Sequence, residues 1–168
     1  MSESIEQPSK YIVYTMTGAE KTAFLRSLVY AGATEPLVRQ TAVGVVKGLG
    51  RDEHWERLVR LHRFVRDSVP YHREPVEMFY RPSDTLVHGA DCDDHVILLC
   101  SMAWSMRYPF IVEALGDPDA PYHYTCRLGW PPNDEPTGDE HTRWASFETT
   151  VDALPGEHVN DALRRMGS

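Results

Sequence analysis

The spacing of apolar residues predicts helices over the first half of the chain. Thr17 and Glu20 have the spacing of a capping box, which opens a first helix. Thr34 and Pro36 begin a second helix, because proline is favoured in the first turn. Glycines are expected to end both helices: Gly32 the first, and Gly48 or Gly50 the second.

A third helix is predicted to follow Asp52, which can cap it, and to end before Pro70. Its apolar residues recur at helical spacing and fall on one side, which is typical of a face that packs against a core. These residues are Trp55, Leu58, Val59, Leu61, Val65 and Val69.

The pattern changes over residues 71–90, which are rich in proline and aromatic residues without helical period. We expect an extended segment that crosses the surface. Acidic residues then crowd residues 91–94, and residues 96–104 are apolar almost throughout. This pattern predicts a helix whose first turn meets solvent and whose body is buried in the middle of the protein.

Strands are predicted in the second half of the chain. Residues 109–115, 122–128 and 144–151 have the composition of strands, and residues 131–142 form an obvious loop. Helices followed by strands predict an α+β fold with a small antiparallel sheet. We expect one domain over residues 1–168, with a mobile tail at 1–10 and a short strand within 11–16.

Composition narrows the functional classes. The chain has 168 residues, with 17 basic and 25 acidic residues and a formal net charge of −8. No basic surface for nucleic acid or anionic membranes is expected, whereas a neutral or basic partner is favoured. The N-terminus has no apolar leader, and the longest apolar stretch, 96–104, is far too short to span a membrane. We therefore expect a cytoplasmic protein.

Three cysteines occur without paired spacing, which argues against a disulfide framework. Cys100 and Cys126 are interpreted as small buried apolar groups. Cys92 differs, because it lies at the start of the predicted buried helix, where free backbone N–H groups and the helix dipole stabilise a thiolate. The nearby aspartates oppose that effect, so a histidine that accepts the thiol proton becomes more necessary.

The candidate base is His123, at the start of a predicted strand, and its partner is expected on the next strand. Opposed residues in an antiparallel pair have position numbers with a constant sum, so each pairing sets the centre of the turn. Pairing His123 with Glu148 centres the turn between residues 135 and 136, and pairing it with Asp152 centres it between 137 and 138. Both centres fall within the loop, so the register allows either acid.

A cysteine at a helix start, followed by a histidine and an acid on successive strands, is the chain order of papain-like cysteine enzymes. In detail the sequence resembles the transglutaminase-like superfamily, especially its compact bacterial and phage members. The resemblance covers about residues 60–151 and is carried by Leu61–Tyr71, Pro82–Leu86, Gly89–Asp94, Tyr122–Tyr124 and Trp144–Thr149.

This resemblance implies a papain-like core with Cys92 as nucleophile, His123 as base and Glu148 as the orienting acid. Two residues depart from the family pattern. Ala90 stands where a second glycine is common. Glu148 stands where the family usually has aspartate, and the longer side chain must pack differently.

We expect a cysteine peptidase or amidase that cleaves amide bonds through a thioacyl intermediate, without a cofactor. Its substrate would be a peptide or protein, and the net negative charge of the chain favours a basic one. Two alternatives on the same chemistry are a crosslinking transglutaminase and a deamidase, and an alternative of another class is a non-catalytic binding or assembly module.

Two other sites are disfavoured by the sequence. A metal could take ligands from the group His88, Asp91, Asp93, Asp94 and His95. Residues 93–95 are successive on a helix, however, and fan out by about 100° each, so they cannot converge. A phosphate-transferring Asp-x-Asp site needs a buried apolar strand before it, which residues 86–90 do not provide.

Overall fold

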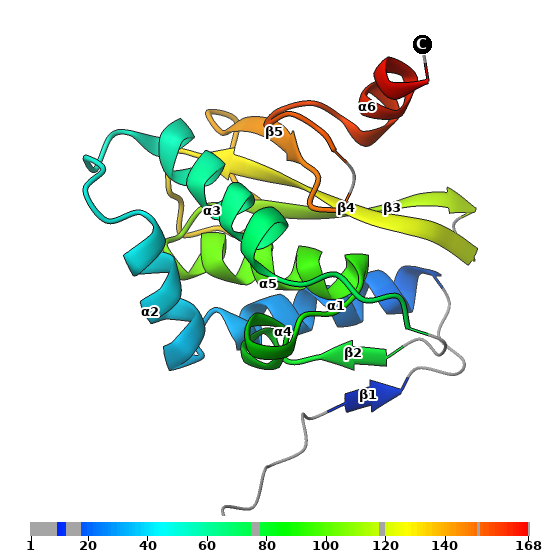
Figure 1. Ribbon diagram of the computed structural model, residues 1–168. Helices are drawn as coiled ribbons and strands as arrows, with labels where there is room; N and C mark the ends of the chain where they lie inside the picture. The colour runs from blue at the N-terminus through cyan, green and yellow to red at the C-terminus, as the bar shows by residue number, and fades with distance from the viewer. Residues whose placement is uncertain (1–9, 13–17, 75–77, 118–119, 151, 168) are drawn as a thin grey trace, which may run out of the picture.

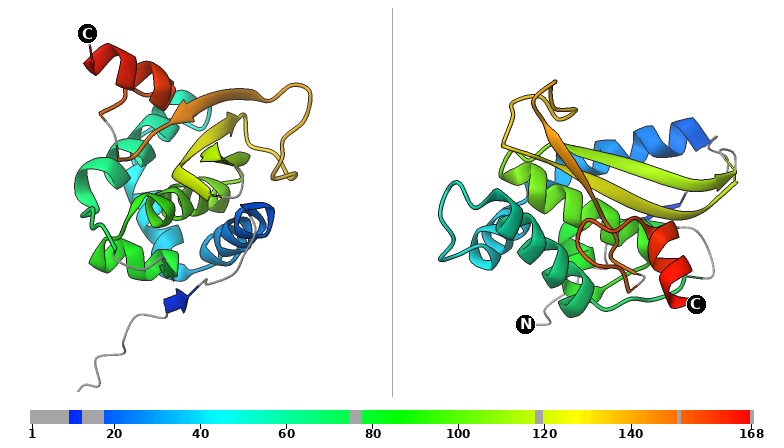
Figure 2. Two further views of the ribbon diagram at one scale, coloured as in Figure 1. Left: turned by 90° about the vertical axis from the view of Figure 1, so that its right-hand side faces the viewer. Right: turned by 90° about the horizontal axis from the view of Figure 1, so that it is seen from above.

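Helix α5 (Cys92–Ser105) lies at the centre of the fold. The computed structural model describes residues 10–12, 18–74, 78–117, 120–150 and 152–167. Residues 96–104 are buried, as the apolar run of the sequence predicts. Asp93, Asp94 and His95 are buried as well, so the expectation that the first turn meets solvent is wrong for these residues. Figures 1 and 2 show the other elements arranged around this helix. It contacts α1 (Gly18–Gly32), α2 (Pro36–Val45), α3 (His54–Ser68), α4 (Pro82–His88) and β4 (Ala120–Trp130).

A three-stranded antiparallel sheet covers one side of α5. Its strands follow the order β3 (Phe110–Asp117), β4 and β5 (Arg143–Phe147). Tyr124, Cys126 and Leu128 alternate along β4 and are almost completely buried. A separate pair joins β1 (Lys10–Ile12) to β2 (Met78–Tyr80). The α+β class with a small antiparallel sheet is confirmed.

Several predicted elements have different bounds. The first, third and buried helices occur as α1, α3 and α5, but α2 ends at Val45, and the turn that follows contains Gly48 at a φ of 89°. Trp55 is 37% exposed rather than a core residue, and it packs against Trp130 and Phe147. The predicted tail over residues 1–9 and residues 13–16 of the predicted strand lie outside the described residues.

The prediction of an extended segment over residues 71–90 is wrong, because this region contains β2 and α4. Pro82 occupies the first turn of α4, which is only seven residues long and therefore too short to show helical period. Helix α6 (Val159–Met166) was not predicted. The last strand ends at Phe147 rather than at 151, since the Glu148 carboxylate accepts hydrogen bonds from Thr150 and turns the chain.

The segment before α5 is tied to the end of α3. The backbone N–H of Ala90 donates to the carbonyl of Pro70 at 3.1 Å, and that of His72 donates to Ala90 at 2.9 Å. Gly89 lies between α4 and this pairing at a φ of 74°, where a Cβ would collide with the Pro70 carbonyl oxygen. Within the described residues, each helix is either too short or too polar to span a bilayer.

Gly89→Ala is expected to lower the free energy of unfolding by about 2 kcal/mol or more, because it combines a backbone collision with a left-handed φ. Gly44→Ala is the matched control: it lies on α2 with open space around the missing Cβ, so it should raise stability by up to about 1 kcal/mol. Urea unfolding followed by circular dichroism measures both. Equal stability of the two variants would contradict the tight approach at Gly89.

Candidate active site

The fold brings His123 and Glu148 into contact and places Cys92 near the strand that carries the histidine. Cys92 is the first residue of α5, His123 lies on β4, and Glu148 directly follows β5. The His123 Nε2 and Glu148 Oε2 atoms are 2.7 Å apart. The backbone N–H of Tyr124, the neighbour of His123, lies near enough to the Cys92 thiol to act toward a lower pKa. The thiol therefore lies against the strand that carries the histidine.

Glu148 is held on every side. Its side chain is 1% exposed, and its second oxygen accepts the N–H and the hydroxyl of Thr150 at 2.8 and 2.9 Å. Burial raises the pKa of Glu148, but the hydrogen bond and charge of His123, together with the Thr150 donors, outweigh it and lower the net pKa. The carboxylate is thus ionised and fixed in one orientation.

The backbone of Glu148 is also anchored. Its carbonyl accepts a hydrogen bond from the Nε2 of His62, a fully buried residue of α3. Burial lowers the pKa of His62, which keeps its imidazole neutral and able to donate from one nitrogen. The same ring contacts Phe147 edge-on, with centroids 5.4 Å apart. His62 therefore sets the position at which the chain leaves β5.

Neither of the two predicted hairpin registers occurs. Cys126 lies opposite Phe147, and Trp130 lies opposite Arg143, so the true register falls midway between the two alternatives. Strand β5 ends before it reaches the level of His123. Glu148 bridges the offset because its side chain is longer than that of aspartate. Asp152 instead lines a pocket with His95 and Tyr71.

The Cys92 thiol donates a hydrogen bond to the Asp93 carboxylate, with 3.2 Å between sulfur and oxygen. Burial raises the pKa of Cys92 strongly, and the negative charge of Asp93 raises it further. The N–H of Tyr124 acts in the opposite direction. In this arrangement the thiol is protonated, and a base is needed to ionise it.

Lys21 from α1 compensates the charge of Asp93. Their side chains are 3.7 Å apart and less than a tenth exposed. The ammonium also lies 4.7 Å from the centre of the Tyr124 ring, in cation–π geometry. Burial raises the pKa of Asp93, whereas the charges of Lys21 and His123 lower it. Asp93 thus links α1, the thiol and the histidine.

The other two cysteines agree with their interpretation as buried apolar groups. Cys100 and Cys126 are fully buried, whereas Cys92 is partly exposed. Contact with Cys100 and burial raise the pKa of Cys126 well above its usual value. Of the three thiols, Cys92 is the one that a reagent in solution can reach.

Asp93, Asp94 and His95, three members of the disfavoured metal group, do not converge. Asp93 contacts Cys92 and Lys21, Asp94 accepts the N–H of Tyr80 at 2.8 Å, and His95 contacts the Pro70 carbonyl. This divergence follows from their successive positions on α5.

A different group, Glu74, Asp91 and Asp94, places its ligand oxygens within 4.8 Å of one another. Such oxygens suit a hard cation. Burial and the neighbouring carboxylates raise the pKa of Asp91 to about 6 and that of Asp94 to about 9. At neutral pH a proton on Asp94 therefore reduces the negative charge of the cluster.

No family model matches the sequence, and neither a curated protein nor a solved structure matches it. The assignment of roles therefore rests on the geometry of the site itself.

Sequence reasoning did not find three supporting residues: Lys21, His62 and Thr150. Lys21 and His62 act through contacts between elements that are far apart in the chain. Thr150 instead follows Glu148 by two residues. A hydroxyl residue two positions after a buried acid is a weak signal of a local turn. A histidine within an apolar helix face, such as His62, is a second weak signal.

Asp93→Asn is expected to lower the pKa of the Cys92 thiol, because it removes the negative charge that disfavours the thiolate. Alkylation of Cys92 by iodoacetamide should become faster at neutral pH, and its pH profile should move to lower pH. Peptide mass spectrometry measures the rate, with Cys100 and Cys126 as internal references. An unchanged pH profile would contradict the role of Asp93.

The same variant leaves the buried ammonium of Lys21 without its carboxylate, which should cost roughly 3 kcal/mol of stability. Adding Lys21→Met should recover most of that loss. The double variant therefore separates the electrostatic effect on the thiol from a general loosening of the fold.

Proposed function

We propose that this protein is a cysteine-dependent acyl-transfer enzyme that hydrolyses amide bonds in peptides or proteins. The observation that carries the proposal is the buried His123–Glu148 pair, with 2.7 Å between nitrogen and oxygen, beside a partly exposed thiol at a helix N-terminus. A nucleophile, a base and a group that orients the base are the three parts that this chemistry needs.

In the proposed reaction, the thiol turns from Asp93 to His123 and gives its proton to Nδ1, the ring nitrogen that Glu148 does not bind. The thiolate attacks the amide carbonyl carbon, and the N–H groups at the start of α5 stabilise the oxyanion. His123 then protonates the leaving amine, and the C–N bond breaks to leave a thioester. Water, deprotonated by His123, hydrolyses the thioester and restores the thiol.

Hydrolysis is favoured over transfer to an amine because an amine acceptor requires an acyl-enzyme shielded from water. The loop at residues 131–142 carries the exposed acids Asp134, Glu135, Asp139 and Glu140. This loop lies past the C-terminal end of α5, where it is hydrogen-bonded to Arg107 and Phe110, so it does not cover Cys92 at the other end of that helix. A papain-like or transglutaminase-like core in a cytoplasmic enzyme is part of the same proposal.

A non-catalytic binding module is the second candidate function. The observation that favours it is the hydrogen bond from the Cys92 thiol to Asp93, which holds the proton on sulfur. The two candidates differ in the reactivity of this thiol, because a primed nucleophile is alkylated faster than an inert one.

Cys92→Ala is expected to abolish amide hydrolysis while the fold is retained, since the side chain is small and only partly buried. A library of fluorogenic peptide amides and unfolded protein substrates provides the assay, and circular dichroism with a thermal melt checks the fold. Turnover that persists in the variant would exclude Cys92 as nucleophile. Efficient incorporation of an added primary amine into products would favour crosslinking over hydrolysis.

Glu148→Gln is expected to lower kcat by about three to four orders of magnitude, because an amide neither favours the required imidazole tautomer nor stabilises imidazolium. The matched control is Glu140→Gln, which changes an exposed carboxylate of the 131–142 loop and should leave kcat unchanged. A kcat for Glu148→Gln within a few-fold of the parent would show that His123 works without this partner.

A further inference from the structure

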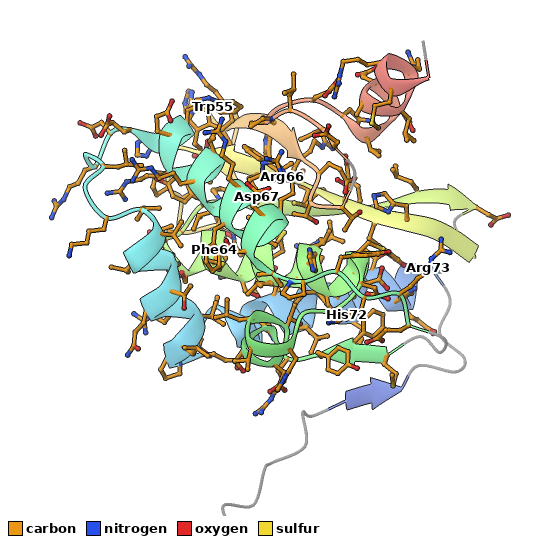
Figure 3. All side chains as sticks on the ribbon, in the orientation of Figure 1. Trp55, Phe64, Arg66, Asp67, His72 and Arg73 are labelled. Atoms are coloured by element: carbon orange, nitrogen blue, oxygen red, sulfur yellow. The ribbon has the colours of Figure 1, made fainter. Side chains whose placement is uncertain are left out.

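A pocket of about 490 Å³ is lined in part by Thr149 and Thr150, the two residues that follow Glu148 in the chain. We call it the α3–α5 pocket, because it is bounded by the end of α3, residues 68–71, His95 of α5 and residues 149–152. Figure 3 shows Arg66 and Asp67 at the end of α3 beside this region. A larger pocket of about 740 Å³ lies between α1 and β3. Cys92, His123 and Glu148 line neither pocket, but only the α3–α5 pocket is lined by residues that follow Glu148 directly.

Three contacts connect the α3–α5 pocket to the site. Thr150 lines the pocket and also holds the Glu148 carboxylate. His95 follows Cys92 by three residues on α5, so the two side chains occupy the same helix face one turn apart. Tyr71 lines the pocket, and its backbone pairs with Ala90, two residues before the thiol. The pocket therefore adjoins the turn after Glu148 and the segment that leads into Cys92.

His95 supplies an unused hydrogen-bond acceptor. Its ring is 1% exposed, and its Nε2 lies 3.2 Å from the Pro70 carbonyl oxygen. Because a carbonyl only accepts, Nε2 carries the proton and Nδ1 presents a lone pair. No described residue hydrogen-bonds to that buried Nδ1 atom. Burial also lowers the pKa of His95, which keeps the ring neutral. The Thr149 hydroxyl, 3% exposed, is likewise without a partner among the described residues.

The charges of the pocket leave one carboxylate in excess. Arg66 and Asp67 neutralise each other, with 2.8 Å between Nε and Oδ1. Asp152 also lines the pocket; among the described residues its carboxylate makes neither a hydrogen bond nor a close ion pair, but it interacts electrostatically with Arg66 and Arg165. The backbone carbonyl of Asp152 is held by Arg165 at 2.8 Å, which fixes its place.

We propose that the α3–α5 pocket binds a basic side chain, arginine or lysine, of the peptide substrate, with its N–H groups directed to His95 Nδ1 and the Asp152 carboxylate. The identification of the occupant as substrate rests on the proposed function. A cation satisfies both acceptors with donors alone. A neutral carboxamide brings a carbonyl oxygen that the acceptors repel, and an acidic side chain adds a second negative charge.

Binding is measured by NMR titration of the Cys92→Ala protein, so that the result does not depend on turnover. The probe is N-acetylarginine amide, and its neutral isostere N-acetylcitrulline amide is the reference. We expect the arginine probe to bind at least about tenfold more tightly, with shifts at Tyr71, His95 and Thr150. Asp152→Asn should remove most of that preference. Asp52→Asn, an exposed acid at the opposite end of α3, is the control that should keep it.

Equal affinity for the two probes, tighter binding of N-acetylglutamine amide, or shifts confined to the 131–142 loop would overturn the proposal. N-acetyllysine amide and its neutral reference N-acetylnorleucine amide test binding of a lysine side chain in the same way. In the parent enzyme, matched arginine and citrulline peptides should differ in kcat/KM, and Asp152→Asn should reduce that difference. Specific arginine binding without cleavage of any peptide would count against the proposed hydrolase while supporting the specificity of the pocket.

Discussion

The complete burial of α5 is the constraint on which the rest of the structure depends. A helix that is apolar nearly all round must be covered on every side, so α1, α2, α3, α4 and the sheet all pack against it. Its first turn is the exception, because it carries charged residues and a thiol. The elements that pack around the body of the helix therefore also supply the polar residues that surround its N-terminus.

Electrostatics at that N-terminus are a balance of opposed effects. The helix dipole and the N–H of Tyr124 favour a thiolate at Cys92, whereas burial and Asp93 disfavour it more strongly. Lys21 offsets the charge of Asp93 from α1. A buried thiol in such surroundings ionises only when a base takes its proton. The need for a base is a physical reason for a histidine beside the thiol to be paired with an ionised carboxylate.

The backbone around the site is connected as tightly as the side chains. His62 of α3 holds the carbonyl of Glu148, and the Pro70–Ala90 pairing joins the end of α3 to the start of α5. The wall of the α3–α5 pocket is made from these same segments. The residues that line the pocket and those that hold Glu148 and Cys92 in place therefore belong to the same connected segments.

The pattern of residues in the sequence was sufficient to predict those features that depend on local chain chemistry. The apolar run after Cys92 determined the buried helix, the face of α3 followed from its spacing, and the chain order of Cys92, His123 and an acid indicated the site. The short helix α4 was not predicted, because its seven residues are too few to show a helical period.

Only the tertiary structure decided between Glu148 and Asp152. The choice depends on a β4–β5 register that lies midway between the two predicted ones, and on the turn at Thr150 that ends β5. It also decided the partners of Asp93 and the grouping of His95 with Asp152, since Lys21 and the α3–α5 pocket come from segments remote in sequence. Contacts of this kind arise from the packing of whole elements, whose relative placement no local pattern encodes.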